Sequence, residues 1–253
     1  VVNLGCNSLA WAVLDLACSV INAVHVPVDS RFSISQKEYC IELVKPTLIF
    51  SDKPVDGESQ SLDQLTFLRL SGTSIDQIAS PFLPNDLANI LFTSGTTGIQ
   101  KGVMLSHKNL LSNALAKLDA MPQNQHDHRL NFLPFSHAYA RTCELTAWLI
   151  SNSSMEVASG FEGVLKQAEF AKATLINGVP IFYESLVQRL DQTHGIRSFA
   201  REILGGQIRR LASGGATLSN GTRARFANIG LPIYQGYGLT ESSPVICSNR
   251  SAK

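Results

Sequence analysis

Along the chain, segments with the apolar spacing of amphipathic helices alternate with short apolar runs that are typical of buried strands. Leu9, Val13, Leu16 and Val20 recur three or four residues apart with polar residues between them, which predicts an amphipathic helix. Asp15 lies inside this apolar stretch, and a carboxylate in the middle of a membrane costs roughly 2.5–3.5 kcal/mol. The pattern therefore favours a buried helix over a membrane span.

Short apolar runs that alternate with amphipathic stretches predict parallel sheets covered by helices, an α/β architecture. Ser35 followed by Glu38 has the spacing of a capping box, which predicts the start of a helix that ends near Val44. Ser106 is a second candidate cap, for a helix that carries Leu110. We expect further helices at about 138–150, 164–171, 181–190 and 219–227. We expect strands at 24–28, 47–50, 90–92, 103–105, 130–133, 155–158, 174–176, 208–212 and 232–234. The polar stretches 52–60 and 71–86 are predicted loops.

Composition narrows the class of protein further. The 253 residues suffice for one large or two smaller domains, and 44% hydrophobic with 16% charged residues is typical of a globular chain. The formal net charge of +1 gives no electrostatic reason to expect a nucleic acid partner. The five cysteines are widely and irregularly spaced, which indicates neither a zinc site nor a disulfide framework and fits a cytoplasmic setting.

Candidate chemistry begins directly after the predicted strand 90–92. Residues 93–102 read T-S-G-T-T-G-I-Q-K-G, with glycines that permit close approach of a ligand, several hydroxyl groups and the cation of Lys101. Many donors, one cation and little bulk are what a polyphosphate requires. The spacing around Lys101 excludes the Walker A loop, because Gln100 and not glycine precedes the lysine.

This stretch resembles the signature loop of the adenylate-forming enzymes, in which proline usually stands where this chain has Gln100. Three later motifs follow in the family's order: L-P-F-S-H at 133–137, S-G-G-A at 213–216 and Y-Q-G-Y-G-L-T-E at 234–241. The stretch N-A-V-H-V-P at 22–27 is also similar to a family segment, so the resemblance covers nearly the whole chain.

The resemblance implies a role for each motif. ATP would contact Thr93, Ser94, Gly95, Thr96, Thr97, Gly98, Lys101, Gly214, Gly215, Ala216, Gln235, Gly236, Tyr237, Gly238 and Thr240. Glu241 and Thr96 would hold Mg²⁺, which prefers carboxylates together with phosphate oxygens. The catalytic residues would be Lys101, His137, Thr240 and Glu241, with His137 positioning the attacking carboxylate.

Residues 133–141 look most like the long-chain fatty acyl-CoA synthetase branch, although Ala140 replaces the usual glutamate. The resemblance therefore implies a ligase that uses a fatty acid, ATP and coenzyme A. The acyl pocket would include His137, Ala138, Arg141, Gly178 and Val179. A ligase for an aryl acid, an amino acid or an acyl-carrier protein, and a non-catalytic homologue that binds nucleotide or acyl-adenylate, are the alternatives.

We expect residues 1–253 to form part of the family's large N-terminal domain, with 1–80 as a first α/β part and 81–253 carrying the motifs. The ribose-binding aspartate and the small C-terminal domain of the family would lie beyond Lys253, so this chain alone should be inactive. A peripheral contact of the parent enzyme with a membrane is compatible with this interpretation, and the oligomeric state is open.

Overall fold

The computed structural model describes residues 1–53, 59–62, 81, 83–94, 99–191 and 204–250. These residues belong to two compact units. Unit 1 contains Val1–Ser112 and Pro134–Ala138, and unit 2 contains Asn113–Leu133 and Tyr139–Lys253.

Unit 1 is built around a four-stranded parallel sheet with the strand order β2-β1-β3-β4. A separate antiparallel hairpin, β5 with β6, pairs Thr93 with Lys101. The strands are β1 (Val2–Asn3), β2 (Val26–Pro27), β3 (Ile49–Ser51), β4 (Ser59–Ser61), β5 (Leu87–Ser94) and β6 (Gln100–Ser106), and the helices are α1 (Leu9–Val20), α2 (Ile34–Val44) and the start of α4 (His107–Ala120).

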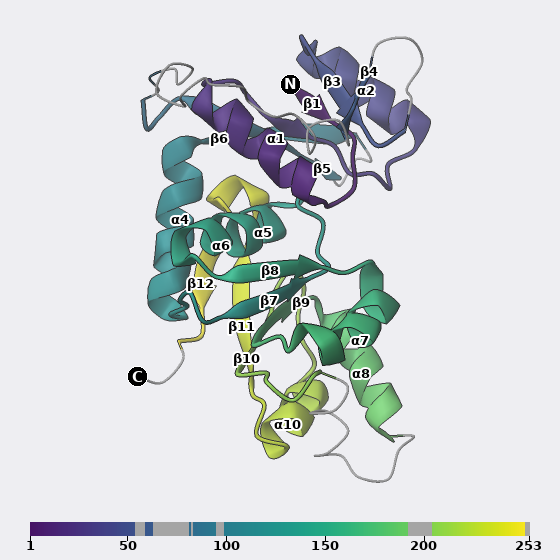
Figure 1. Ribbon diagram of the computed structural model, residues 1–253, viewed down its shortest axis with the longest axis vertical. Helices are drawn as coiled ribbons and strands as arrows, with labels where there is room; N and C mark the ends of the chain where they lie inside the picture. The colour runs from purple at the N-terminus through teal and green to yellow at the C-terminus, as the bar shows by residue number, and fades with distance from the viewer. Residues whose placement is uncertain (54–58, 63–80, 82, 95–98, 192–203, 251–253) are drawn as a thin grey trace. The chain divides into compact units, whose positions relative to one another are not determined.

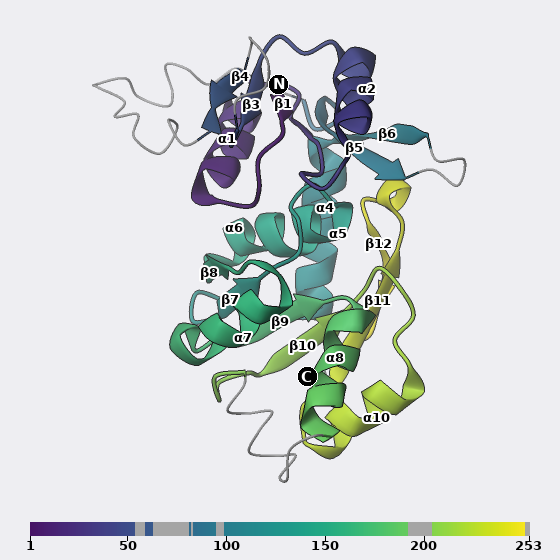
Figure 2. The same cartoon turned by 90° about the vertical axis from the view of Figure 1, so that its right-hand side faces the viewer.

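Two helices cover opposite faces of the small parallel sheet. Val2 and Asn3 are neighbours on β1, so their side chains point to opposite faces. Val2 belongs to an apolar cluster with Cys40 of α2, whereas Asn3 contacts His25, whose ring packs edge-on against Trp11 of α1. Figure 2 shows α1 and α2 on either side of these strands.

The start of α2 differs from the predicted capping box. Ser33, not Ser35, is the N-cap: its hydroxyl accepts from the Gln36 N–H, and the Gln36 side chain accepts from the Ser33 N–H. Ser33 has the extended backbone that an N-cap requires, whereas Ser35 already lies within the helix. The predicted end at Val44 is correct.

Unit 2 contains a six-stranded sheet with the order β12-β11-β10-β9-β7-β8, in which only the β11–β12 pair is antiparallel among the described strands (Figure 1). The strands are β7 (His128–Asn131), β8 (Ser154–Val157), β9 (Leu175–Gly178), β10 (Arg210–Ser213), β11 (Ile233–Gly238) and β12 (Val245–Ser248). The helical segments are the rest of α4, α5 (Ala138–Ala140) from Tyr139 onward, a π-helix (Arg141–Thr146), α6 (Ala147–Ser151), α7 (Gly160–Ala171), α8 (Pro180–Asp191), α10 (Asn220–Asn228) and a 3₁₀ turn (Thr240–Ser242).

The two faces of this sheet are chemically different. On one face, side chains of α7, α8 and α10 form an apolar core with Leu130, Ile176 and Leu211 of the strands. On the other face Arg129, which is 1% exposed, pairs with Glu144 of the π-helix at 3.0 Å. Such a buried pair requires further hydrogen bonds, and Arg129 also donates to the Cys143 carbonyl and to the Ser153 hydroxyl.

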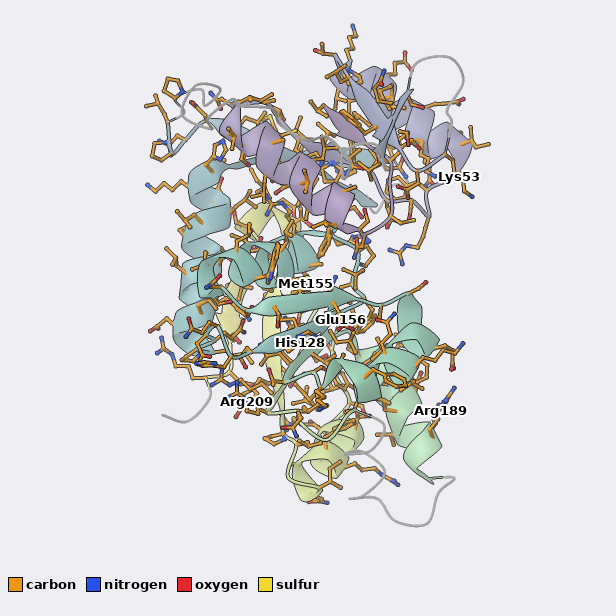
Figure 3. The ribbon with its side chains drawn as sticks, viewed as in Figure 1. Lys53, His128, Met155, Glu156, Arg189 and Arg209 are labelled. Carbon is orange, nitrogen blue, oxygen red and sulfur yellow. The ribbon has the colours of Figure 1, made fainter. Side chains whose placement is uncertain are left out.

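Polar contacts join the amino ends of the parallel strands. Asp127 precedes β7 and accepts hydrogen bonds from the Asn124 N–H, at 3.0 Å, and from the Thr174 hydroxyl, at 2.8 Å. It also pairs with Arg209, which precedes β10. In Figure 3, His128 and Glu156 lie together on β7 and β8, with His128 Nε2 3.5 Å from Glu156 Oε1. These contacts hold the edge of the sheet that lies opposite the carboxyl ends of the strands.

The α/β class and the mostly parallel sheets are confirmed, whereas several boundaries are corrected. The short strand β4 begins at Ser59, inside the predicted loop 52–60, and β12 was not expected. The helix predicted at 138–150 is interrupted by six residues of π-helix. Most of the predicted loop 71–86 lies outside the described residues. Among the described helices, none is long and apolar enough to cross a membrane.

Candidate functional site

Three neighbouring parallel strands of unit 2 end in glycine-containing segments at the same edge of the sheet. Gly178 ends β9, Gly214 follows β10, and Gly238 ends β11. The Gly214 N–H donates to the Gly178 carbonyl at 3.2 Å, so the first two segments are in direct contact. Ligands of open parallel α/β sheets bind at this carboxyl edge, because backbone groups there are free to approach them.

The turn after β10 favours glycine for steric and conformational reasons. A Cβ atom at Gly214 would lie 3.1 Å from the ring of Tyr139, and Gly215 has a φ of +82°, which favours glycine. Burial raises the pKa of the Tyr139 hydroxyl well above its usual value. Gly215 and Ala216 are exposed, so the turn presents bare backbone to solvent beside the ring of Tyr139.

The end of β11 presents the candidate adenine platform. Gln235 and Gly236 are half-buried, whereas Tyr237 is 59% exposed. The pairing with β12 shifts register between Tyr237 and Gly238, and a Cβ atom at Gly238 would lie 1.8 Å from the Pro244 carbonyl oxygen. Only glycine therefore allows the two strands to approach this closely.

Thr240 and Glu241 follow on the short 3₁₀ turn. The Ser242 hydroxyl donates to the Leu239 carbonyl at 2.8 Å, which closes the turn. Asn113 of α4 fixes the segment further, since its amide group donates to the Val245 carbonyl and accepts from the Val245 N–H. The turn is thereby held rigidly while the Glu241 side chain is exposed.

Part of the candidate phosphate loop lies in unit 1. Thr93 and Ser94 end β5, and Lys101 pairs with Thr93 across the hairpin with its side chain exposed. Gly95, Thr96, Thr97 and Gly98 lie outside the described residues. Gln100, where the family usually has proline, is buried at 5% exposure.

His137, also in unit 1, contacts two residues that the sequence analysis did not select. Its Nε2 atom lies 2.8 Å from Asp29 Oδ2 and 2.7 Å from Arg31 Nη2. Although burial opposes ionisation of Asp29, hydrogen bonds from His137 and Arg31 hold the pKa of its carboxyl well below the usual range. The only signal in the sequence was a pair of opposite charges directly after a strand, which many surface turns also have.

The residues expected at the acyl pocket lie in different surroundings. Ala138 is buried in unit 1, next to His137 in the chain. Arg141 is 5% exposed in the π-helix of unit 2 and donates to the Thr146 hydroxyl at 2.7 Å. Gly178 lies against the rings of Phe182 and Tyr183, and Val179 is half-buried beneath Gly215.

Within unit 2 the structure thus brings together Gly178, Val179, Gly214–Ala216 and the exit of β11. Within unit 1 it pairs Thr93 with Lys101 and places His137 beside Asp29. A mostly parallel sheet with bare backbone at its carboxyl edge is typical of α/β proteins that bind a small ligand at that edge.

Comparison with known proteins specifies this class. The family model of the AMP-binding enzymes matches residues 1–253, and the chain belongs to this family. It is 27% identical over 248 residues to a feruloyl-CoA synthase of Amycolatopsis sp, covering 95% of this chain and 49% of that protein. It is also 27% identical over 271 residues to long chain acyl-CoA synthetase 8 of Arabidopsis thaliana, covering 83% of this chain and 37% of that protein.

Among solved structures, ATP-bound MatB from Rhodopseudomonas palustris matches with a TM-score of 0.80 and 26% identity. The match covers 98% of this chain and 51% of that one. The chain therefore spans about half the length of the proteins that it resembles, or less.

Proposed function

We propose that the full-length protein activates a carboxylic acid with ATP, releases pyrophosphate, and transfers the acyl group from the adenylate to coenzyme A. The observation that carries this proposal is the shared carboxyl edge of β9, β10 and β11, where bare glycine backbone lies next to an exposed tyrosine. Membership in the AMP-binding enzyme family supports it.

The nucleotide would lie along the carboxyl edge of unit 2. Tyr237 offers an aromatic face for adenine, and the exposed backbone of Gly215 and Ala216 can approach the same base. Thr240 would donate a hydrogen bond to the α-phosphate. The neighbouring Glu241 is suited to Mg²⁺, because that ion prefers one or two carboxylates together with phosphate oxygens.

Few protein ligands would be needed for this ion. Within the described residues, no group of three or more histidine, cysteine, aspartate or glutamate side chains could hold a metal. Glu241 and the hydroxyl of Thr96 would hold the ion together with the phosphates. Mg²⁺ bound there would neutralise charge on the polyphosphate.

Lys101 and the hydroxyl groups of Thr93 and Ser94 would hold the β- and γ-phosphates, together with the backbone of residues 95–98. The hairpin pairing of Thr93 with Lys101 supports this role, since it places both side chains at the base of the same loop. A carboxylate oxygen, positioned by His137, then attacks the α-phosphorus and pyrophosphate leaves. The thiol of coenzyme A subsequently attacks the acyl carbonyl and AMP leaves.

A fatty acid is the acyl substrate that we favour, and an aryl acid is the second candidate. The fatty acid is supported by the segment from Leu133 to Arg141 and by the similarity to long chain acyl-CoA synthetase 8. The aryl acid is supported by the similarity to feruloyl-CoA synthase. Both candidates use the same nucleotide site and differ only in the acyl pocket.

Carboxylate-dependent exchange of pyrophosphate into ATP tests this proposal on the full-length protein. A panel of short, medium and long fatty acids, ferulate, benzoate and amino acids ranks the substrates. We expect Glu241→Ala to lower the exchange rate about 100-fold or more, because it removes charge stabilisation at the phosphates. The exposed Glu42 of α2 provides the matched control, and Glu42→Ala should leave the rate unchanged. No exchange by the folded wild type with any acid would instead favour a nucleotide-binding homologue without ligase activity.

A further inference from the structure

Asp29 occupies a fixed position in a turn directly after β2. The Arg31 N–H donates to Asp29 Oδ1 at 2.9 Å, and the Phe32 N–H donates to the Asp29 carbonyl at 3.0 Å. The aspartate side chain is only 6% exposed. A carboxylate that accepts a backbone N–H two residues ahead in this way is held by the turn itself. Its position is therefore set independently of His137.

His137 reaches Asp29 on a segment that is separately anchored to unit 1. The Phe135 N–H donates to the Asn7 side-chain oxygen at 2.8 Å, and the Phe135 ring packs against Trp11 with 5.2 Å between the ring centres. The His137 N–H donates to the Pro134 carbonyl at 3.0 Å. The two sides of the contact, 108 positions apart in the chain, are thus both held in place.

A single ring nitrogen of His137 faces two groups with opposite requirements. Nε2 must carry a proton to donate to Asp29 Oδ2, but it must lack one to accept from Arg31 Nη2. Arg31 is 67% exposed, and its Nε atom already donates to Asp29 at 3.0 Å. Its Nη2 atom also donates to Asp29 Oδ2, at 2.7 Å, so the guanidinium group already has the carboxylate as its acceptor and does not require Nε2 as one. The contact with Asp29 therefore determines that Nε2 carries a proton.

We propose that Asp29 is a positioning residue that fixes the His137 ring with its proton on Nε2, leaving Nδ1 for contact with the acyl carboxylate. The role of His137 in this inference rests on the proposed function. Only the protonated ring carries a proton on Nδ1 that it can donate to the acyl carboxylate, and in that ring Nε2–H still donates to Asp29. Arg31 balances the charge of Asp29, so that the pair does not repel an incoming carboxylate.

Replacement of Asp29 by asparagine should move the proton of the neutral His137 ring from Nε2 to Nδ1 without removing the turn. The amide oxygen can still accept the Arg31 N–H, as asparagine commonly does in such turns. The NH₂ group then faces Nε2, which has to accept a hydrogen bond. The neutral ring of Asp29→Asn should therefore carry its proton on Nδ1.

The ¹⁵N NMR signals of labelled histidine measure this tautomer directly in the pH range where the ring is neutral. The His137→Gln variant identifies the signals of His137 among the six histidines. We expect Nε2–H in the wild type and Nδ1–H in Asp29→Asn. The exposed Asp119, which pairs with Arg250, supplies the control, and Asp119→Asn should keep the wild-type pattern. An unchanged tautomer in Asp29→Asn would overturn the proposal.

Pyrophosphate exchange by the full-length protein tests the consequence for the reaction. We expect Asp29→Asn to lower kcat at least about tenfold, with little change in KM for ATP, because an NH₂ group facing Nε2 no longer accepts from the protonated ring whose Nδ1–H donates to the acyl carboxylate. In the His137→Ala background the same substitution should have no further effect, because Asp29 acts through the ring. Independent, additive losses would show that Asp29 does not act through His137. No exchange by the wild type would overturn the ligase function, while the NMR result would still decide the contact between Asp29 and His137.

Discussion

Lys117 of α4 has its ammonium group enclosed within unit 2. The residue is 5% exposed, and within the described part of the chain no hydrogen-bond partner reaches its Nζ atom. Burial and, to a lesser extent, the charge of Arg129 lower the pKa of Lys117 to about 8. Glu144 is nearby but already paired with Arg129. The lysine is therefore expected to destabilise the fold.

Lys117→Met should stabilise the protein at pH 7, by roughly 3 kcal/mol at 1.36 kcal/mol per pKa unit. In the pH range between the folded pKa of about 8 and the usual 10.5, the unfolded chain binds more protons than the folded one. The stability of the wild type therefore rises with pH across that range, and the advantage of the variant should disappear by about pH 10.5.

Urea unfolding at pH 7, 9 and 10.5 measures this difference between Lys117→Met and the wild type. The exposed Lys108 of the same helix is the control, and Lys108→Met should change stability by less than about 0.5 kcal/mol. A gain that stays constant with pH would mean that packing, and not the buried charge, is responsible.

At the scale of elements, the close approach of strands β11 and β12 depends on Gly238. A Cβ atom at Gly238 would meet three backbone atoms of Pro244 and Val245 at 3.0 Å or less, and backbone cannot turn away as a side chain can. At Gly236, two residues earlier on β11, the nearest atom would be 3.8 Å away, an ordinary contact.

Gly238→Ala should therefore lower the free energy of unfolding by about 3 kcal/mol or more, because the strands must separate locally. Gly236→Ala should cost less than about 1 kcal/mol. Chemical denaturation of both variants measures the difference. Similar losses at the two positions would contradict the close contact between Gly238 and Pro244.

Periodicity predicted most elements correctly, and the errors have identifiable causes. Ser33 and Ser35 are each followed three residues later by a side chain suited to a capping box, so the sequence alone did not distinguish them. Strand β4 contains no apolar residue and so produces no apolar signal, whereas the apolar run of β12 has only three residues, Val245–Cys247, which is shorter than the runs that predict a buried strand.

The candidate site was predictable only where it is local in sequence. The turn at Gly214 and the exit of β11 are contiguous motifs, and their side-by-side arrangement follows from parallel pairing. The approach of His137 to Asp29 depends on how distant segments pack, which periodicity does not encode. The same holds for the ring of Tyr139 over Gly214.

At the scale of the whole molecule, each unit contains a buried aspartate that accepts hydrogen bonds from several donors. In unit 1 this residue is Asp29, and in unit 2 it is Asp127, which is 2% exposed. Burial disfavours the charge of Asp127, but hydrogen bonds from Asn124, Thr174 and Arg209 outweigh it and lower the pKa of this carboxyl. Both groups are therefore expected to remain ionised in the folded chain at a pH where they are protonated in the unfolded chain.

Acid should consequently destabilise both units. A lowered folded pKa contributes stability that is fully present above the unfolded aspartate pKa of about 3.9 and is lost as the pH falls toward the folded value.

Charged hydrogen bonds are worth about 1.5–3 kcal/mol, so Asp127→Asn and Asp29→Asn should each be destabilised by that order at pH 6. The two variants should also lose less stability than the wild type between pH 6 and pH 3. Urea unfolding across this range measures both effects, and Asp119→Asn, a change at an exposed aspartate, should follow the wild type. If the variants lost stability on acidification as steeply as the wild type, the acid sensitivity would have to come from other carboxylates.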